Sequence, residues 1–238
     1  MTDYTYAGAE LDLFAAALTW KSYLRRRVEP YLGRAVLEVG AGLGGTTRVL
    51  CRGDQDRWVC LEPDADLAGR LAEELRAGRL PACCQLRVGT LAGQAPEPEF
   101  DTLLYIDVLE HIEDDAAELA GAVGWLRPGG HLVVLSPAHP WLFTPFDAAI
   151  GHFRRYTKRT LAALTPPGLD LVRLNYLDSV GMLASLGNRL VLHRAMPDPK
   201  QIAVWDRVMV PVSRVLDPLL AYSLGKSVLG VWRRRPHP

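Results

Sequence analysis

The sequence predicts an α/β protein built on a doubly wound, Rossmann-like sheet. Short apolar runs alternate with helical patterns along the first 137 residues, and only short connections separate them. Such strand–helix–strand repeats fold as right-handed crossovers between parallel strands. A chain of 238 residues, 49% of them apolar, is long enough for one well-packed domain and short for two.

The expected elements follow one another without repeats or a clean linker. Residues 10–32 have the apolar spacing of one helix. Further helical patterns begin at Thr46, Asp64 and Glu113, and others cover 158–164 and 179–222. The expected strands are 35–40, 57–64 with the turn that ends it, 83–89, 100–107, 131–137, 169–178 and 225–235. We place the last of these strands at an edge of the sheet.

The segment VLEVGAGLGG carries the first functional signal, because an apolar strand runs directly into a glycine-rich turn. Glycines permit positive φ and let a ligand approach the backbone closely. Gly40, Gly42 and Gly45 have the Gly-x-Gly-x-x-Gly spacing of a dinucleotide site. Glu38, Gly40, Gly42 and Gly44 instead have the acid-x-Gly-x-Gly-x-Gly spacing of an S-adenosylmethionine site. The spacing alone leaves both ligands open.

Acidic residues near the ends of the first two strands sharpen the choice of ligand. Glu62 follows the glycines by about 20 residues, where a carboxylate can accept hydrogen bonds from the ribose of either ligand. Glu38 precedes the first glycine. A carboxylate there suits a ligand that carries an ammonium group and repels a pyrophosphate. The pattern therefore favours S-adenosylmethionine over NAD.

Three further motifs, LEPD, FDTLLYIDVLEHI and LRPGGHLVVLSP, complete a pattern that resembles the class I S-adenosylmethionine-dependent methyltransferases. The loop PAHPWLFTPFDAAIGHFRRYTKRTL and the closing LGKSVLGVW further resemble a small bacterial subgroup with a GHxRRYT-type loop. The resemblance implies a seven-stranded, mostly parallel sheet with an antiparallel last strand and a helical cap. It also implies S-adenosylmethionine as methyl donor and S-adenosylhomocysteine as product.

On this basis we expect a single methyltransferase domain over 1–238. Residues 1–34 would form a helical lid, and 35–137 would form the cofactor-binding core. Residues 138–238 would supply the acceptor-side loop, a helical cap insertion at about 179–222 and the final strands.

The resemblance also implies roles for particular residues in the cofactor site. Gly40, Gly42 and Gly44 would line the methionine portion of the cofactor. Glu38 would support the turn or contact the amino group, and Asp107 would lie beside the methionine end and the sulfonium. Glu62 would hold the ribose, Thr90 and Leu91 would border the adenine, and Trp20 would fold over the cofactor. Many family members carry an acid near Thr90, and VGTLAG has none, so the Thr90 hydroxyl or backbone atoms would replace it.

Histidines after the fifth strand are the candidate bases. Methyl transfer is a displacement on an activated sulfonium, so proximity supplies much of the rate, and a base is needed only where the acceptor must lose a proton. His139 and His152 are the catalytic candidates. Each could instead order its loop through a backbone hydrogen bond. We interpret His111 as a buried structural side chain.

Arg154, Arg155 and Tyr156 are the expected substrate-binding residues. One arginine could meet an anionic acceptor in bidentate fashion. The alternative is a salt bridge with Asp107, Glu110 or Asp147.

Apolar residues recur every three or four positions between 200 and 220, which indicates an amphipathic helix. Polar residues such as Asp206 and Asp217 are expected on its other faces, and Pro211 and Pro218 are expected to break or kink it. We interpret this helix as a cap over the acceptor pocket. A dimer surface, a membrane-facing patch and plain core packing are the alternatives.

Composition argues against several classes of partner. The chain has 27 Lys and Arg against 27 Asp and Glu, so it lacks the basic excess of a nucleic-acid binder. We see no signal peptide and no apolar run of ~18 residues, so we expect a cytoplasmic protein without stable membrane insertion. The four cysteines have no zinc spacing, so we expect no metal.

We therefore expect a metal-independent bacterial enzyme that methylates O or N of a small, apolar or aromatic metabolite, with a homodimer left open. The alternatives are an NAD-dependent oxidoreductase or epimerase, a non-catalytic S-adenosylmethionine-binding protein and a non-methylating reaction such as a cyclisation. No Tyr-x-x-x-Lys pair stands at a suitable place for hydride transfer.

Overall fold

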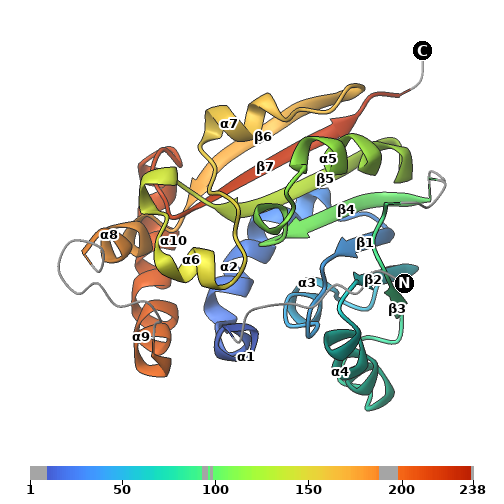
Figure 1. Ribbon diagram of the computed structural model, residues 1–238, viewed down its shortest axis with the longest axis horizontal. Helices are drawn as coiled ribbons and strands as arrows, with labels where there is room; N and C mark the ends of the chain where they lie inside the picture. Colours follow the sequence, from blue (N-terminus) through green and yellow to red (C-terminus); the bar gives the residue numbers. More distant parts are fainter. Residues whose placement is uncertain (1–9, 93–95, 97–98, 188–197, 237–238) are drawn as a thin grey trace.

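The computed structural model describes residues 10–92, 96, 99–187 and 198–236, which form a seven-stranded sheet covered by helices (Figure 1). The sheet order is β3-β2-β1-β4-β5-β7-β6. The strands are β1 Ala35–Val39, β2 Arg57–Glu62, β3 Cys84–Val88, β4 Phe100–Ile106, β5 Leu126–Pro137, β6 Leu169–Leu177 and β7 Ser227–Arg234. All neighbouring pairs are parallel except the two that involve β7. The predicted fold class is confirmed.

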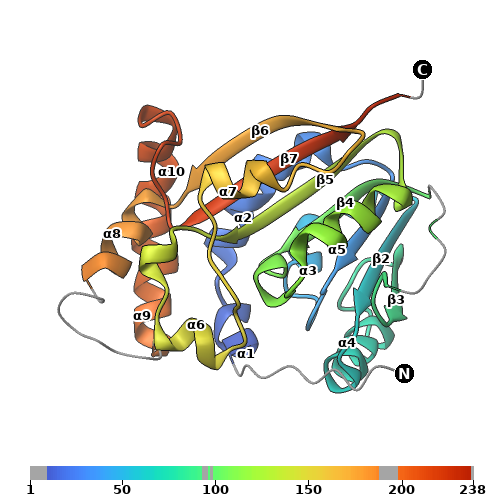
Figure 2. The same ribbon diagram turned by 45° about the horizontal axis from the view of Figure 1, so that its top comes forward.

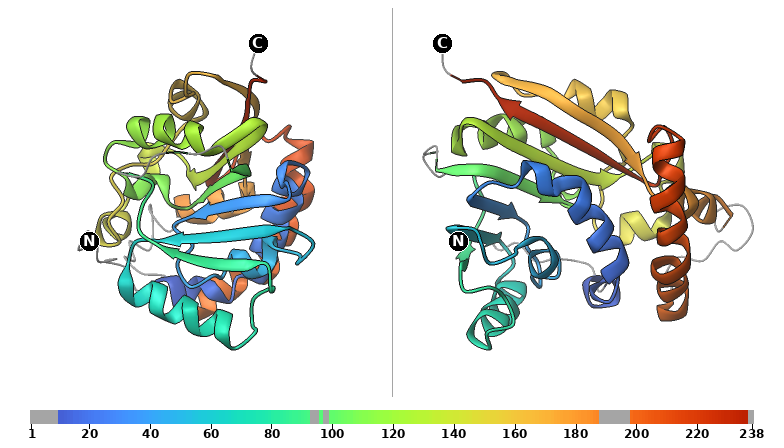
Figure 3. Two further views of the ribbon diagram at one scale, coloured as in Figure 1. Left: turned by 90° about the vertical axis from the view of Figure 1, so that its right-hand side faces the viewer. Right: turned by 180° about the vertical axis from the view of Figure 1, so that it is seen from behind.

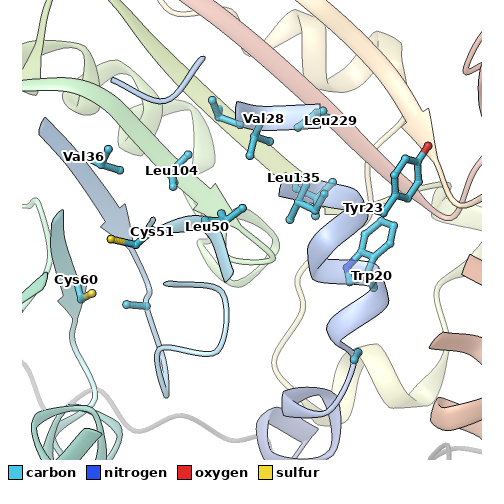
Figure 4. Packing of buried hydrophobic residues seen from close by; sticks show 14 of the residues in the cluster. Trp20, Tyr23, Val28, Val36, Leu50, Cys51, Cys60, Leu104, Leu135 and Leu229 are labelled. Carbon is cyan, nitrogen blue, oxygen red and sulfur yellow. The ribbon is translucent and has the colours of Figure 1, made fainter. Parts of the chain in front are cut away.

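Helices pack on both faces of the sheet and create two hydrophobic clusters. One face carries α2 Leu18–Val28, α3 Thr47–Leu50 and α4 Ala65–Arg76, and the other carries α5 Asp115–Ala122 and α7 Lys158–Ala163 (Figure 2). Successive strand residues face opposite sides. Val36 and Leu104 accordingly join the first cluster, while their neighbours Leu37 and Leu103 join the second (Figure 4).

The last strand, β7, lies between β5 and β6, so its predicted place at an edge was wrong. Trp232 pairs with Leu132 on one side and Leu171 on the other. A strand with two neighbours must bury both faces, and Val228 and Trp232 are indeed fully buried. Its predicted antiparallel direction is confirmed, and β6 is the edge strand.

The helix predicted over 10–32 is divided. It forms α1 Glu10–Ala15, α2 and the 3₁₀ turn η1 Glu29–Tyr31. No local side chain caps the start of α2. Asp206 does so instead, because its carboxylate accepts the backbone N–H of Thr19 (3.1 Å) and of Trp20 (2.8 Å). The first turn of α2 is thus completed by a residue 187 positions away in sequence.

The cap consists of α8 Ser179–Gly187, α9 Pro199–Val204, a π-helical turn Trp205–Met209 and α10 Val210–Leu219. Residues 188–197 of the predicted insertion lie outside the described residues. The helix after 199 continues through both prolines, so of the predicted break or kink the break did not occur. Instead the wider π turn directly precedes Pro211. In a regular α-helical turn the Pro211 ring would clash with a preceding backbone carbonyl, and its nitrogen could not donate the usual hydrogen bond. Seen from behind, α10 runs beside α2 (Figure 3).

Three cysteines that are separated in sequence come together in the fold. The sulfur of Cys51 lies 3.4 Å from that of Cys83 and 3.6 Å from that of Cys84. Sequence spacing could not reveal this trio, because β3 brings residues 83 and 84 beside the end of α3. Cys60 is buried on β2.

Among the helices described, none has the length and apolar character needed to cross a bilayer.

Candidate active site

A cavity of about 920 Å³ opens at the carboxyl ends of β1, β4 and β5. The glycine turn, the end of β4 and the loop after β5 form its floor and one wall. Helices α1 and α2 and cap helices α8 and α9 enclose the rest. Doubly wound sheets bind ligands at this edge, and the volume is typical of a small-molecule site.

The glycine turn after β1 presents bare backbone to the cavity. Gly40 and Gly42 have φ of +66° and +55°, a region that other residues rarely adopt. A Cβ at Gly40 would lie 2.6 Å from Val108 Cγ2, so packing excludes one there. At Gly42 a Cβ would meet only Leu11, at 3.6 Å. The turn is therefore a cradle that a side chain at Gly42 would begin to fill. Gly44 also has positive φ but does not line the cavity.

Glu62 ties the end of β2 to the glycine turn. Its carboxylate accepts the backbone N–H of Gly42 at 2.7 Å and that of Asp64 at 3.0 Å. Burial raises the pKa of Glu62, and these two hydrogen bonds partly oppose the rise. The carboxylate thus holds the turn open, but Glu62 does not line the cavity, and its contact with a ribose remains a prediction.

Glu38 supports the same turn from the inside. One of its carboxylate oxygens accepts hydrogen bonds from the Thr47 hydroxyl (2.7 Å) and the Trp58 indole (2.8 Å). Burial raises the pKa of Glu38 to about 7, although both hydrogen bonds oppose the rise. Glu38 does not line the cavity. Of its two expected roles, this placement favours support of the turn over contact with an amino group.

Thr90 and Leu91 follow β3, as expected, but neither lines the cavity. Leu91 is buried in the second hydrophobic cluster, and Thr90 is half-buried. Their contact with an adenine ring remains a prediction.

Asp107, at the end of β4, presents its carboxylate to the cavity. Its φ is +55°, and its backbone N–H donates to the Leu135 carbonyl at 2.9 Å. The low-dielectric surroundings raise the pKa of Asp107 to about 6, and the charges of His152, Lys226 and Lys21 partly oppose the rise.

The N-terminal helices close the cavity beside the glycine turn. Trp20 is 8% exposed, lines the cavity and packs against Trp205, with 5.9 Å between the ring centroids. This contact joins α2 to the cap.

Sequence reasoning missed the lysines of this site. Three of the chain's four lysines, Lys21, Lys200 and Lys226, line the cavity. Lys226 lies 3.6 Å from the Trp205 ring centroid and 3.7 Å from Asp178 Oδ2. Lysine is rare in this arginine-rich chain, and this rarity was the sequence feature that could have directed attention to these residues.

Asp147, which is fully buried, organises the acceptor side of the cavity. It lies 3.0 Å from His152 Nδ1, and both its oxygens accept hydrogen bonds from Arg155, at 2.8 and 2.9 Å. Burial would raise the pKa of Asp147, but the hydrogen bonds from His152 and Arg155 hold it well below its ordinary value. His152 and Arg155 both line the cavity. Arg155 therefore forms the salt bridge that was its alternative role.

His139, Arg154 and Tyr156 do not line the cavity. His139 Nε2 lies 3.0 Å from the Gly225 carbonyl oxygen, and its ring stacks on Tyr176. Arg154 forms a 2.8 Å salt bridge with Asp115, and the Tyr156 hydroxyl donates to the same carboxylate at 2.7 Å. The geometry therefore favours His152 over His139 at the acceptor.

Comparison with known proteins agrees with this geometry. Residues 37–132 match the family model of a methyltransferase domain. A ubiquinone biosynthesis O-methyltransferase of Xylella fastidiosa (strain 9a5c) is 33% identical over 152 residues, which cover 54% of this chain and 59% of the relative. A demethylmenaquinone methyltransferase of Tropheryma whipplei (strain Twist) is 28% identical over 148 residues, which cover 61% and 57%. The chain thus spans less than two thirds of these relatives.

Solved structures share the fold over nearly the whole chain. The [4+2]-cyclase SpnF has a TM-score of 0.64 at 15% identity, covering 98% of this chain and 97% of that one. The N-methyltransferase NodS from Bradyrhizobium japonicum WM9, in complex with S-adenosyl-L-homocysteine, has a TM-score of 0.57 at 17% identity, covering 95% and 91%. At these identities the likeness concerns the fold alone.

The sheet order and the glycine turn held by Glu62 define a Rossmann-like protein that binds a nucleoside cofactor. Residues 37–132 therefore carry a methyltransferase domain, and the chain resembles the class I S-adenosylmethionine-dependent methyltransferases.

Proposed function

We propose that this protein transfers a methyl group from S-adenosylmethionine to O or N of a small, apolar or aromatic acceptor. The observation that carries the proposal is the single cavity that joins the glycine turn and Asp107 to His152 beneath the cap. Donor and acceptor could therefore meet in one enclosed space. The names of the ubiquinone biosynthesis O-methyltransferases among the relatives favour an oxygen acceptor.

The cofactor end of this cavity suits S-adenosylmethionine chemically. When bound, the cofactor supplies a methyl group already activated on a sulfonium. The Gly42 backbone would cradle the methionine portion, and the Asp107 carboxylate would attract its ammonium group. Glu62 would hold the ribose, and Thr90 and Leu91 would border the adenine.

The acceptor end combines apolar walls with several polar groups, among them Glu110, His152 and Arg155. Leu142, Phe146, Ile150 and Met209 line it, which favours an apolar or aromatic ring. His152 Nδ1 is engaged by Asp147, so Nε2 is the nitrogen left for an acceptor. As the acceptor oxygen bonds to the methyl carbon, the C–S bond breaks with its electron pair going to sulfur, and His152 takes the acceptor proton. The ionised Asp147 stabilises the resulting imidazolium.

Methyl transfer to catechol and to a primary aromatic amine tests this function directly. We expect S-adenosylhomocysteine to form from S-adenosylmethionine only when an acceptor is present. His152→Ala should slow transfer by about 10²–10⁴-fold, the usual contribution of a general base, and leave cofactor affinity unchanged. His139→Ala, outside the cavity, is the matched comparison. Tight binding of NADH without binding of S-adenosylmethionine would overturn the proposal, and cofactor binding without turnover of any acceptor would indicate a binding protein.

Affinity for S-adenosylhomocysteine should depend on pH through Asp107. Below about pH 6 its carboxyl is protonated and no longer attracts the ligand's ammonium group. Affinity should therefore rise by up to about tenfold per unit as pH increases toward 6, and then level off. Calorimetry between pH 5 and 8 measures this dependence. Asp107→Asn should bind weakly with a flat profile, whereas His152→Gln should retain the slope. A flat wild-type profile contradicts the role of Asp107.

A further inference from the structure

A group of side chains at the acceptor end of the cavity has the composition of a metal site. Glu110, His111 and His152 each offer one ligand atom, and these atoms lie within 4.8 Å of one another. All three residues line the cavity. Two histidines and one carboxylate are a recurrent ligand set for divalent metal ions, with the remaining positions open to substrate.

Glu110 is the most unusual member of the group. It is fully buried, and neither of its carboxyl oxygens makes a hydrogen bond within the described part of the chain. Buried polar groups are almost always paired. A cation beside Glu110 would satisfy its two carboxyl oxygens.

Both histidines are held as metal ligands usually are. The ring nitrogen that does not bind the metal normally pairs with a carboxylate or the backbone. His152 Nδ1 meets Asp147 at 3.0 Å, and His111 hydrogen-bonds to the backbone of Gly151. The two rings lie side by side, with 4.5 Å between centroids. His152 therefore directs Nε2 toward Glu110, and His111 offers one ligand atom within the same group.

The spacing of the ligand atoms agrees with a shared ion. His152 Nε2 lies 3.9 Å from Glu110 Oε1. Two ligand atoms that each bind an ion at about 2.1 Å can be at most about 4.2 Å apart. The separation of His152 Nε2 and Glu110 Oε1 is within this limit, so both atoms can bind one ion with little movement.

We propose that Glu110, His111 and His152 bind one divalent metal ion with nitrogen and oxygen ligand preference, in the acceptor part of the cavity. This differs from the metal-independent enzyme expected from the sequence. The reason is that Glu110 and His111 belong to one turn, whereas His152 comes from a loop about 40 residues later that β5 brings back beside it.

The metal site refines the acceptor class, and this part of the inference rests on the proposed function. A bound ion acts as a Lewis acid and lowers the pKa of a coordinated hydroxyl. The preferred acceptor would then present two adjacent oxygens, as catechol does. His152 Nε2 would bind the ion and could not also act as the base. The coordinated hydroxyl would lose its proton to water, and its oxygen would take the methyl group as the C–S bond breaks.

Titration calorimetry on the EDTA-treated full-length chain tests the site with Mn²⁺ and Zn²⁺ as probes. We expect one Mn²⁺ per chain. Glu110→Gln and His111→Gln should each weaken binding at least about 100-fold, because a lost ligand costs no less than a lost outer-shell partner. His131→Gln changes a histidine in the middle of β5 that does not line the cavity, and it should bind as wild type does. Circular dichroism checks that each variant is folded.

The cysteine trio provides a second control, because thiolates prefer Zn²⁺ to Mn²⁺. Mn²⁺ binding should be unchanged in Cys83→Ser. The site is wrong if the folded wild type binds neither ion, if both ligand variants bind as wild type does, or if only Cys83→Ser loses the ion. Binding of S-adenosylhomocysteine is measured separately. Cofactor binding without metal binding overturns the site, whereas metal binding without cofactor binding overturns the proposed function.

A catechol assay separates the two roles of His152. EDTA should abolish methylation of catechol, and added Mn²⁺ should restore it. Undiminished methylation of catechol in EDTA would overturn the role of the ion in methyl transfer.

Discussion

Gly42→Val should abolish binding of S-adenosylhomocysteine while leaving the protein folded. Gly42 has φ of +55°, where a β-branched residue is strained, and its backbone lines the cavity. The valine side chain would project toward Leu11 into the space that a ligand must enter. We expect affinity to fall at least about 100-fold, which exceeds what backbone strain of about 1–2 kcal/mol alone would cause. Calorimetry measures the affinity.

Gly78→Val is the matched control. Gly78 also has a left-handed backbone, with φ of +65°, and a Cβ there would meet nothing within 4 Å. It follows α4 and does not line the cavity. The two variants should lose similar stability, and only Gly42→Val should lose the ligand. Equal affinities in the two variants would show that the glycine turn does not cradle the cofactor.

Asp178→Asn should strongly destabilise the protein, because Asp178 joins the cap to the sheet. Its fully buried carboxylate accepts hydrogen bonds from the Trp205 indole and the Ser213 hydroxyl, each at 2.7 Å, and pairs with Lys226. An amide would turn a donor toward these donors and leave the ammonium without its counter-charge. Removing one partner of a buried pair costs about 3–5 kcal/mol. The melting temperature should fall by roughly 6–20 °C.

Asparagine is chosen at this position because it tolerates the positive φ of Asp178, +66°. The control is Asp170→Asn on β6, which removes an exposed ion pair between Asp170 and Arg235. Exposed pairs contribute little, so its melting temperature should stay close to that of the wild type. Similar melting temperatures for Asp178→Asn and Asp170→Asn would contradict the proposed anchor.

Local features of the fold were predictable where neighbouring residues determine them. Asp64 was expected to begin a helix, and its side chain does accept the backbone N–H groups of Asp66 and Leu67 at the start of α4. Gly78 ends that helix with positive φ. Thr157 similarly begins α7. These signals act over three or four residues, so tertiary packing rarely overrides them.

The cap was only partly predictable. Its amphipathic stripe indicated a helix, but Asp206 and Asp217 were expected on faces away from the core, and both are buried. Asp206 caps α2, and Asp217 accepts hydrogen bonds from Tyr23 and from the backbone of Asp178. Their partners lie far away in sequence, so no local pattern distinguishes these carboxylates from solvent-facing ones.

The acceptor side shows the same limit. His139 and His152 follow the same strand and have similar neighbours in sequence. The backbone of His139 adopts φ of +65°, and its ring meets Gly225 from the turn before β7. His152 is instead directed to the cavity by Asp147. His139 and His152 looked equivalent in the sequence. The backbone φ of His139 and the contact of His152 with Asp147 give them different positions relative to the cavity.

The sequence by itself determined the alternating α/β architecture, the glycine turn with its supporting acids and the resemblance of residues 37–132 to a methyltransferase domain. Each of these depends on periodicity, steric freedom or spacing within a short segment. Only the tertiary structure decided that β7 lies inside the sheet, that distant aspartates hold the cap, and that Glu110, His111 and His152 meet in one cavity. These outcomes depend on contacts between segments far apart in the chain, and the balance of burial and pairing that selects them exists only once the sheet has formed.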